Sequence, residues 1–180
     1  MIKINMGCGW RNFGDDWIHI DGGDYEHLDS KSITKLEIKD NTVDLIYASH
    51  IIEYFDREAV NVLLQEWKRT MKNGGTLRIA VPNFEIISNL YVNKKINLNQ
   101  AIGPLYGKML MSGNTIYHKT TYDFESLKSV LESNGFVDVR LYDWRKTEHS
   151  HFDDHSQAYI PHMDKENGTL ISLNVECKKS

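Results

Sequence analysis

The chain has little of what marks a secreted scaffold, a membrane protein or a nucleic-acid-binding protein. Only two of its 180 residues are cysteine, so a disulfide framework is excluded, and we expect Cys8 and Cys177 to be buried free thiols. No stretch approaches about 18 consecutive apolar residues, so no membrane span is predicted. The formal charge of −4 leaves no basic footprint for nucleic acid. The first residues lack the basic and apolar regions of a signal peptide, so we expect a cytoplasmic protein.

The chain length and the alternation of strand and helix patterns predict one α/β domain over residues 1–180. Seven segments have strand-like patterns: residues 2–6, 17–21, 34–38, 43–48, 76–81, 137–142 and 169–177. Strands that alternate with helices form mostly parallel sheets. We therefore expect a Rossmann-like, mostly parallel seven-stranded sheet with helices on both faces. The sequence does not indicate an oligomeric state.

Two helices have clear boundaries. The first follows Asp56, a capping residue, and ends before Asn73-Gly74-Gly75. The second starts at Asp123 and stops at Asn134-Gly135. Each carries apolar side chains at helical spacing, so each is predicted to pack on the sheet.

Two segments exceed what a minimal α/β domain needs. Residues 84–118 are partly amphipathic and interrupt the sheet, whereas residues 145–168 are long for a structureless connection. We interpret both as insertions that cover a ligand pocket.

The start of the chain indicates a nucleoside site. A strand-like run leads into Gly7-Cys8-Gly9, and a second strand ends at Asp21. The glycines allow a sharp turn and close approach to a ligand, and Asp21 can accept hydrogen bonds from two ribose hydroxyls. Asn12 replaces the third glycine of a dinucleotide motif, and residues 10–16 leave room for about two helical turns at most. The segment is therefore poorly suited to bind a phosphate group. This favours S-adenosylmethionine, a sulfonium compound without phosphate, as the ligand.

These motifs resemble those of the class I S-adenosylmethionine-dependent methyltransferases. Residues 5–9 (NMGCG) are similar to their first motif, Asp21 to their ribose-binding acid, and residues 40–55 to their fourth strand and the turn after it. Residues 64–82 resemble the helix, Gly-Gly turn and fifth strand of small bacterial members, several of which act in glycan or lipopolysaccharide pathways. The resemblance implies an antiparallel hairpin made by the last two strands. The short segment over residues 10–16 departs from the family pattern and predicts a shortened first helix. The resemblance also implies a cofactor site made by Asn5, Gly7, Cys8, Gly9, Asp21 and Ser49.

Methyl transfer needs a nucleophile held in line and, for a hydroxyl, a base. His50 directly follows the strand over residues 43–48, at the rim where ligands bind in such sheets. A histidine there is a candidate general base, and the alternative is a histidine that caps the next turn. His118 is a second candidate, and its neighbour Tyr117 is a candidate substrate contact. The Asp/Asn-Pro-Pro-aromatic motif of many amine methyltransferases is absent, which favours an oxygen nucleophile.

The segment from His149 to His155 is rich in histidine and aspartate. We interpret His151 and His155 as contacts to a small polar acceptor and expect no metal site. Because such residues also ligate zinc, a metal-dependent hydrolase remains an alternative. The chief alternative is an accessory protein that binds S-adenosylmethionine without turnover, and the hydrolase is the third option. Methyl transfer to a sugar or glycan-precursor hydroxyl is the interpretation that we test below.

Overall fold

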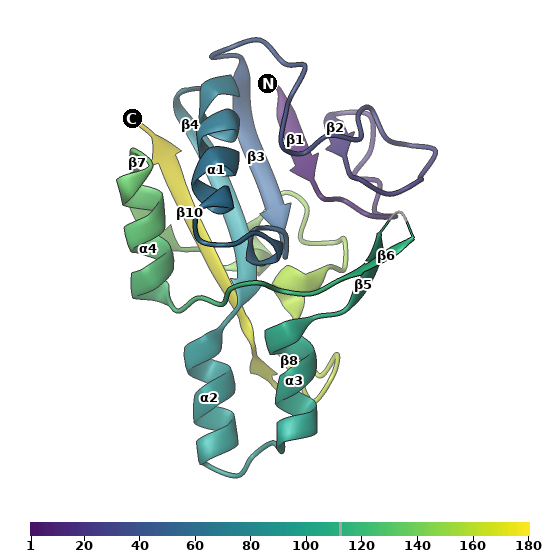
Figure 1. The fold of residues 1–180 in the computed structure, drawn as a ribbon, viewed down its shortest axis with the longest axis vertical. Helices are drawn as coiled ribbons and strands as arrows, with labels where there is room; N and C mark the ends of the chain where they lie inside the picture. The colour runs from purple at the N-terminus through teal and green to yellow at the C-terminus, as the bar shows by residue number, and fades with distance from the viewer. Residues whose placement is uncertain (112) are drawn as a thin grey trace.

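A computed structural model describes residues 1–111 and 113–180. It contains a six-stranded sheet with the strand order β2-β1-β3-β4-β10-β7 (Figure 1). The strands are β1 (Lys3–Met6), β2 (Trp17–Ile20), β3 (Val43–Ser49), β4 (Met71–Pro82), β7 (Phe136–Leu141) and β10 (Ser172–Lys179). The first four are parallel, and β10 is antiparallel to both of its neighbours. The Rossmann-like α/β fold and the antiparallel C-terminal pairing are confirmed.

The predicted strand over residues 34–38 does not form, so the prediction of seven strands was wrong. Side chains of a helix take the backbone hydrogen bonds that a neighbouring strand would make. The Leu36 amide donates to Glu66 Oε1 at 2.7 Å, and Arg69 donates to the carbonyls of Leu36 and Ile38 at 3.0 Å each. Because its polar groups are paired in this way, the segment stays outside the sheet while Leu36 is buried.

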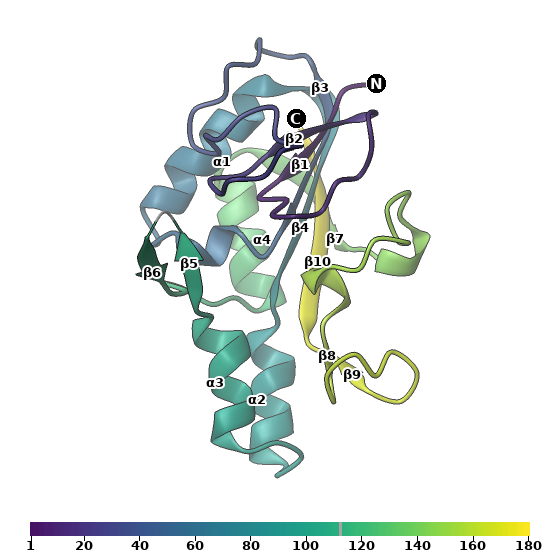
Figure 2. The same ribbon diagram turned by 90° about the vertical axis from the view of Figure 1, so that its right-hand side faces the viewer.

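The two predicted helices form and lie on one face of the sheet (Figure 2). They are α1 (Ala59–Thr70) and α4 (Phe124–Ser133). Asp56 Oδ1 accepts a hydrogen bond from the Ala59 amide at 2.8 Å, and Asp123 accepts one from the Ser126 amide. These carboxylates satisfy amides that have no partner in the first turn of a helix.

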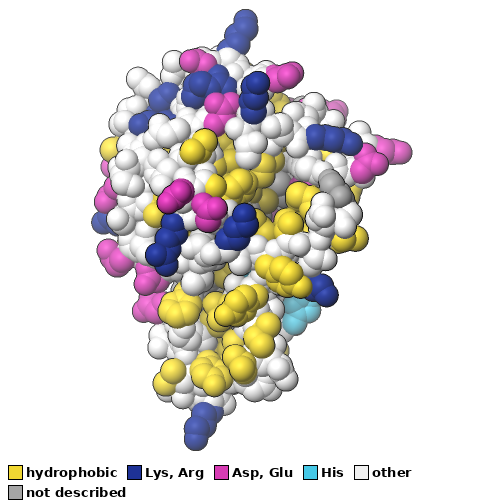
Figure 3. All heavy atoms as spheres, viewed as in Figure 1, with side chains coloured by type: hydrophobic (Ala, Val, Ile, Leu, Met, Phe, Trp, Pro, Cys, Tyr) yellow, Lys and Arg dark blue, Asp and Glu magenta, His cyan; other side chains and the backbone are white. Residues whose placement is uncertain are grey.

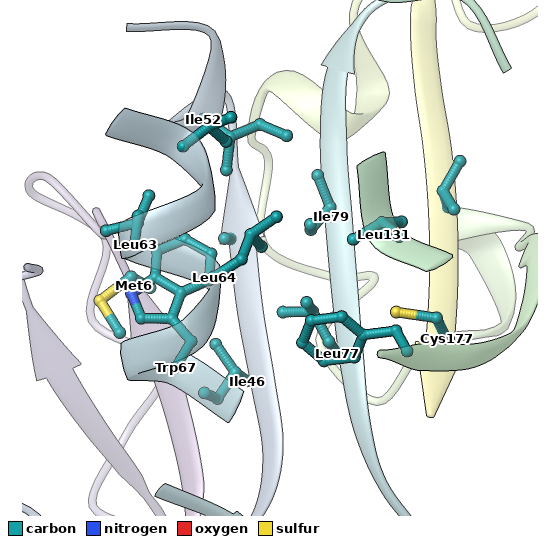
Figure 4. Packing of buried hydrophobic residues seen from close by; sticks show 14 of the residues in the cluster. Met6, Ile46, Ile52, Leu63, Leu64, Trp67, Leu77, Ile79, Leu131 and Cys177 are labelled. Carbon is teal, nitrogen blue, oxygen red and sulfur yellow. The ribbon is translucent and has the colours of Figure 1, made fainter. Parts of the chain in front are cut away.

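Apolar side chains between these helices and the sheet form the main core (Figure 4). Trp67 of α1 is completely buried, and its indole nitrogen donates to the Ile33 carbonyl at 2.9 Å. Leu63 and Leu64 lie beside it, facing Ile46 of β3. Burying side chains of this size typically contributes about 1.5 to 3 kcal/mol each. The core therefore fixes α1 and β3, and with them the residues after β3.

Among residues 1–111 and 113–180 no α-helix covers the opposite face, so the prediction of helices on both faces was wrong, and the shortened first helix does not form. Residues 10–16 connect β1 to β2 as an irregular segment. Phe13 is buried there, with ring centroids 5.3 Å from Trp17 and 4.6 Å from Phe152. Aromatic packing between this connection and the second insertion therefore replaces a helix.

A buried hydrogen bond fixes the second insertion to the sheet. Tyr47 of β3 donates from its hydroxyl to Asp154 Oδ2 at 2.5 Å, and both residues are buried. Burial, with a smaller effect of the Asp154 charge, raises the pKa of Tyr47 well above its usual value. His149 lies 4.1 Å from the Tyr47 ring, and burial lowers its pKa to about 4. These contacts hold the segment around residue 155 over the carboxyl end of β3.

The two predicted insertions contain short elements of their own. Residues 84–118 form α2 (Phe84–Val92), α3 (Leu98–Tyr106), β5 (Met109–Met111) and β6 (Asn114–Ile116). The helices extend beyond the sheet, and the β5-β6 hairpin lies beside the β2 end (Figure 1). The second insertion carries the 3-10 turns η2 (Trp144–Lys146) and η3 (His155–Gln157), and β8 (Tyr159–Ile160), which pairs with β9 (Thr169–Leu170). Within the described part of the chain, no helix has the length and apolar character needed to cross a membrane.

Candidate active site

A cavity of about 970 Å³ lies at the carboxyl ends of the parallel strands. Its walls come from the glycine turn after β1, from the ends of β2, β3 and β4, and from both insertions. The residues predicted as site residues that line it are Gly7, Gly9, Asp21, Ser49, His50, His118 and His155. The structure thus brings together groups that lie up to about 150 positions apart in the sequence, at the edge where α/β sheets bind ligands.

The turn after β1 approaches its surroundings so closely that only glycine fits at one position. Gly7 has φ +66°, and a Cβ added there would lie 1.8 Å from Ile51 Cδ1. Gly9 has φ +57°, but a Cβ there would meet no described atom within 4 Å. Both need the left-handed backbone that favours glycine. Gly9 therefore leaves open space beside the cavity, whereas Gly7 packs under the next loop.

This difference predicts unequal effects for two matched substitutions. Gly9→Ala should reduce the free energy of unfolding by about 1 to 2 kcal/mol, from the left-handed backbone alone. Gly7→Ala should reduce the free energy of unfolding by about 1 to 3 kcal/mol more than Gly9→Ala, because the new methyl overlaps Ile51. Urea unfolding measures both losses. Adding Ile51→Ala should reduce the extra loss in Gly7→Ala, and equal losses in the two single variants would contradict the packing described for Gly7.

Asp21 links two loops at the cavity wall. Its Oδ2 accepts a hydrogen bond from the Gly9 amide at 2.8 Å, and its Oδ1 accepts one from the Gly23 amide at 2.7 Å. The residue is only 8% exposed. Each carboxylate oxygen has a second lone pair, so the fixed carboxylate can still accept hydrogen bonds from ligand hydroxyls.

Two buried polar atoms near the glycine turn lack hydrogen-bond partners among the described residues. They are Ser49 Oγ, at the end of β3, and Asn5 Nδ2, in β1. Ser49 lines the cavity, whereas Asn5 is buried in the strand below it. Because buried polar groups are usually paired, Ser49 has capacity to contact a ligand.

Cys8 lies between the two glycines but does not line the cavity. Its sulfur is 3.6 Å from His27 Nε2. Burial, with a smaller effect of the Asp21 charge, raises the pKa of the Cys8 thiol to about 12. The thiol is therefore protonated near neutral pH and poorly suited to act as a nucleophile.

His50 lies at the cavity wall in a strained backbone conformation. Its φ is +55°, uncommon for a residue with a side chain, and its amide donates to the Ala80 carbonyl at 2.8 Å. His50 Nδ1 is 3.2 Å from Glu53 Oε1, and Nε2 is 3.4 Å from Ser172 Oγ. Both Glu53 carboxylate oxygens lack hydrogen-bond partners among the described residues, so this contact is a close approach of the imidazole to a buried carboxylate rather than a hydrogen bond.

Glu53 is a functional candidate that the sequence analysis missed. Its side chain is completely buried, and His118 Nε2 lies 3.9 Å from Oε1, the same oxygen that His50 approaches. His118 Nδ1 is 3.2 Å from the Leu105 carbonyl, and burial lowers the pKa of His118. The i, i+3 spacing of His50 and Glu53 was the available signal. The contact with His118 has no local signal, because 65 residues separate the two.

The remaining sequence candidates lie in different environments. The His155 ring is 5.2 Å from the His50 ring at the cavity wall, and desolvation, followed by the His50 charge, lowers the pKa of His155. His151 is exposed and packs on Phe152, and Tyr117 is 50% exposed. Neither of these two lines the cavity. Among residues 1–111 and 113–180, no three His, Cys, Asp or Glu side chains are grouped to hold a metal ion.

Comparison with known proteins shows which proteins share this fold. The family model of a methyltransferase domain matches residues 22–79. Among solved structures, an S-adenosylmethionine-dependent methyltransferase from Archaeoglobus fulgidus has 17% identity and a TM-score of 0.57, with 99% of this chain and 86% of that chain covered. One from Methanosarcina mazei has 12% identity and a TM-score of 0.58, with 99% and 92% covered.

A third similar structure has ligands bound. It is the 1,6-didemethyltoxoflavin-N1-methyltransferase of Burkholderia thailandensis, solved with 1,6-didemethyltoxoflavin and S-adenosylhomocysteine. Identity is 11% and the TM-score 0.57, with 99% of this chain and 71% of that chain covered. No curated protein sequence matches the chain. The comparisons show that the chain shares the fold of S-adenosylmethionine-dependent methyltransferases and matches a methyltransferase domain over residues 22–79; they do not support a glycan-pathway subtype.

Proposed function

We propose that this protein transfers a methyl group from S-adenosylmethionine to a small polar acceptor, with a sugar or glycan-precursor hydroxyl as the acceptor class. The observation that carries this proposal is one cavity with two kinds of wall. The first wall includes Gly9 and the Asp21 carboxylate. The second wall includes His50, whose Nδ1 lies 3.2 Å from the carboxylate of Glu53, buried behind it. A nucleoside site and a candidate base therefore face the same space.

The residues at the first wall fit S-adenosylmethionine better than a phosphate-containing nucleotide. Within the described residues no helix lies between β1 and β2. The amides and the helix dipole that would bind a phosphate are therefore missing after Gly9. The Asp21 carboxylate is fixed at the cavity and suits ribose hydroxyls and a cationic ligand. When bound, S-adenosylmethionine supplies an electrophilic methyl group on a sulfonium sulfur.

The second wall fits a hydroxyl acceptor. A hydroxyl is a weak nucleophile that must lose its proton as it attacks, and a positioned base typically contributes about 10² to 10⁴-fold. Glu53 is buried, and its Oε1 lies 3.2 Å from His50 Nδ1, so we assign Glu53 the role of orienting the imidazole. His50 Nε2 then accepts the hydroxyl proton. We assign His118, whose Nε2 lies 3.9 Å from the same oxygen, the role of positioning Glu53.

We propose that the acceptor contacts come from the second insertion, which forms a further part of the cavity wall. His155 lies beside His50 and lines the cavity, so it can donate a hydrogen bond to a hydroxyl next to the reacting one. Tyr117 and His151 lie outside the cavity, so either could reach an acceptor only after movement of its insertion. We therefore place His155 first among the acceptor contacts.

The test is formation of S-adenosylhomocysteine from S-adenosylmethionine with a matched panel of sugars and amino sugars. We expect product with hydroxyl acceptors, and loss of that product in the His50→Ala variant. Turnover only with amines would overturn the oxygen-acceptor proposal. Cofactor binding without product from any acceptor class would instead support a non-catalytic binding protein.

A further inference from the structure

The α2-α3 unit carries much of the exposed apolar surface of the molecule. Figure 3 shows hydrophobic side chains gathered over the lower part of the molecule, where these two helices lie. Of the 16 large hydrophobic residues that are exposed in the described chain, eight lie within residues 84–118. They are Phe84, Tyr91, Val92, Leu98, Ile102, Tyr106, Leu110 and Tyr117. A patch this concentrated indicates an interaction surface rather than scattered surface residues.

The exposed side chains of α3 form a continuous outer stripe. Leu98, Ile102 and Tyr106 follow one another at i, i+4 and i+8, with exposures of 57%, 43% and 60%. Ala101 lies on the inner side, where it packs with Ile87 of α2. The helix pair thus has its own small core, and the outer stripe does not contribute to it. The outer face is therefore free to contact another surface.

The charge around this stripe is positive, unlike that of the whole chain. Lys94 and Lys95 lie at the tip between the helices, and Lys108 follows α3, whereas Glu85 is the single acid within residues 84–118. All three lysines are exposed, and within the described residues none of them forms an ion pair. The chain as a whole has a formal charge of −4. An apolar ridge flanked by unpaired lysines is complementary to an anionic lipid surface.

We propose that the outer face of the α2-α3 unit binds an anionic lipid bilayer. Its apolar stripe enters the boundary between headgroups and acyl chains, and Lys94 and Lys95 contact lipid phosphates. Tyr91 and Tyr106 have an apolar ring and a polar hydroxyl, which suits the membrane interface.

Two other occupants fit this face less well. A two-fold contact between two copies of the chain would set the same patch against itself, which brings like-charged lysines together. A protein partner is less favoured because lysine is depleted in protein interfaces. The inner side of α3 contributes Gly103, Pro104 and Gly107 to the cavity wall, so membrane binding would bring the cavity close to the lipid surface.

The test is co-sedimentation of the full chain with vesicles of phosphatidylcholine alone or of equal parts phosphatidylcholine and phosphatidylglycerol. We expect binding to the anionic vesicles that weakens as salt is raised. Lys94→Gln with Lys95→Gln should weaken partitioning about 30-fold. The matched control, Lys35→Gln with Lys39→Gln, removes the same charge from exposed lysines elsewhere and should have little effect.

A second matched pair tests the apolar contact. Val92 and Val62 are 74% and 72% exposed, but Val62 lies on α1, outside the patch. Val92→Ser should weaken binding to anionic vesicles about tenfold, whereas Val62→Ser should not. Equal effects of the two valine variants, or no sedimentation of the wild type with anionic vesicles, would overturn the proposal. So would a wild-type dimer that Val92→Ser converts to a monomer without any vesicle binding, because the face would then join two copies.

Discussion

Replacing His50 with alanine should lower the turnover number for methyl transfer by about 10² to 10⁴-fold. The dissociation constant for S-adenosylhomocysteine should change little, because the ribose contacts are assigned to Asp21 and not to His50. Steady-state kinetics and calorimetry measure the two quantities separately. Full turnover in the His50→Ala variant would show that the imidazole is not the base. A parallel loss of cofactor binding and thermal stability would show that its role is structural.

Glu53 provides the companion test, since its proposed role depends on His50. Glu53→Gln keeps the size of the side chain but removes the charge 3.2 Å from His50 Nδ1. Turnover should fall, because the carboxylate that lies against the imidazole is replaced by an amide. The double variant should be no worse than His50→Ala alone, since the two residues act as a unit. Glu37→Gln, at an exposed position, is the matched control.

The second large effect is expected at Asp21. Asp21→Ala removes the acceptor for two backbone amides and for the ribose hydroxyls, so the affinity for S-adenosylmethionine should fall by on the order of 1 to 3 kcal/mol. Asp21→Asn keeps one acceptor oxygen and should have an intermediate effect. Asp24→Ala, three residues further on, removes an exposed carboxylate that pairs with Lys31 and should leave affinity unchanged.

Melting curves separate two contributions to the Asp21 effect. Loss of the hydrogen bonds from the Gly9 and Gly23 amides should lower the melting temperature even without ligand. Loss of the ribose contacts should reduce the further stabilisation that saturating ligand gives. Unchanged stabilisation by ligand in Asp21→Ala would contradict the assignment of Asp21 as the ribose-binding acid.

The features that sequence predicted well depend on local patterns. Helices α1 and α4 have capping carboxylates and apolar residues at helical spacing, so their positions could be predicted within a few residues. The glycine turn and Asp21 could be placed at one rim because parallel strands end at the same edge. Of the two histidines four residues apart in the second insertion, His155 lines the cavity and His151 does not.

The features that sequence did not predict depend on contacts between distant residues. Residues 34–38 have the apolar spacing of a strand, but Glu66 and Arg69 pair with their backbone. The second insertion packs on the sheet face opposite α1 and α4. It is held there by the hydrogen bond between Tyr47 and Asp154, which lie 107 positions apart. No local pattern encodes such partners, since each requires the fold to bring them together.

Calorimetric titration of the wild-type protein with S-adenosylhomocysteine, alongside NAD, tests the central claim most directly. The cavity bounded by Gly9, Asp21 and Ser49 predicts one site with a dissociation constant in the micromolar range, equivalent to about −8 kcal/mol. NAD should bind much more weakly, because no helix follows the glycine turn to bind its pyrophosphate. No detectable binding of S-adenosylhomocysteine, or equal or tighter binding of NAD, would contradict the assignment of this cavity to S-adenosylmethionine.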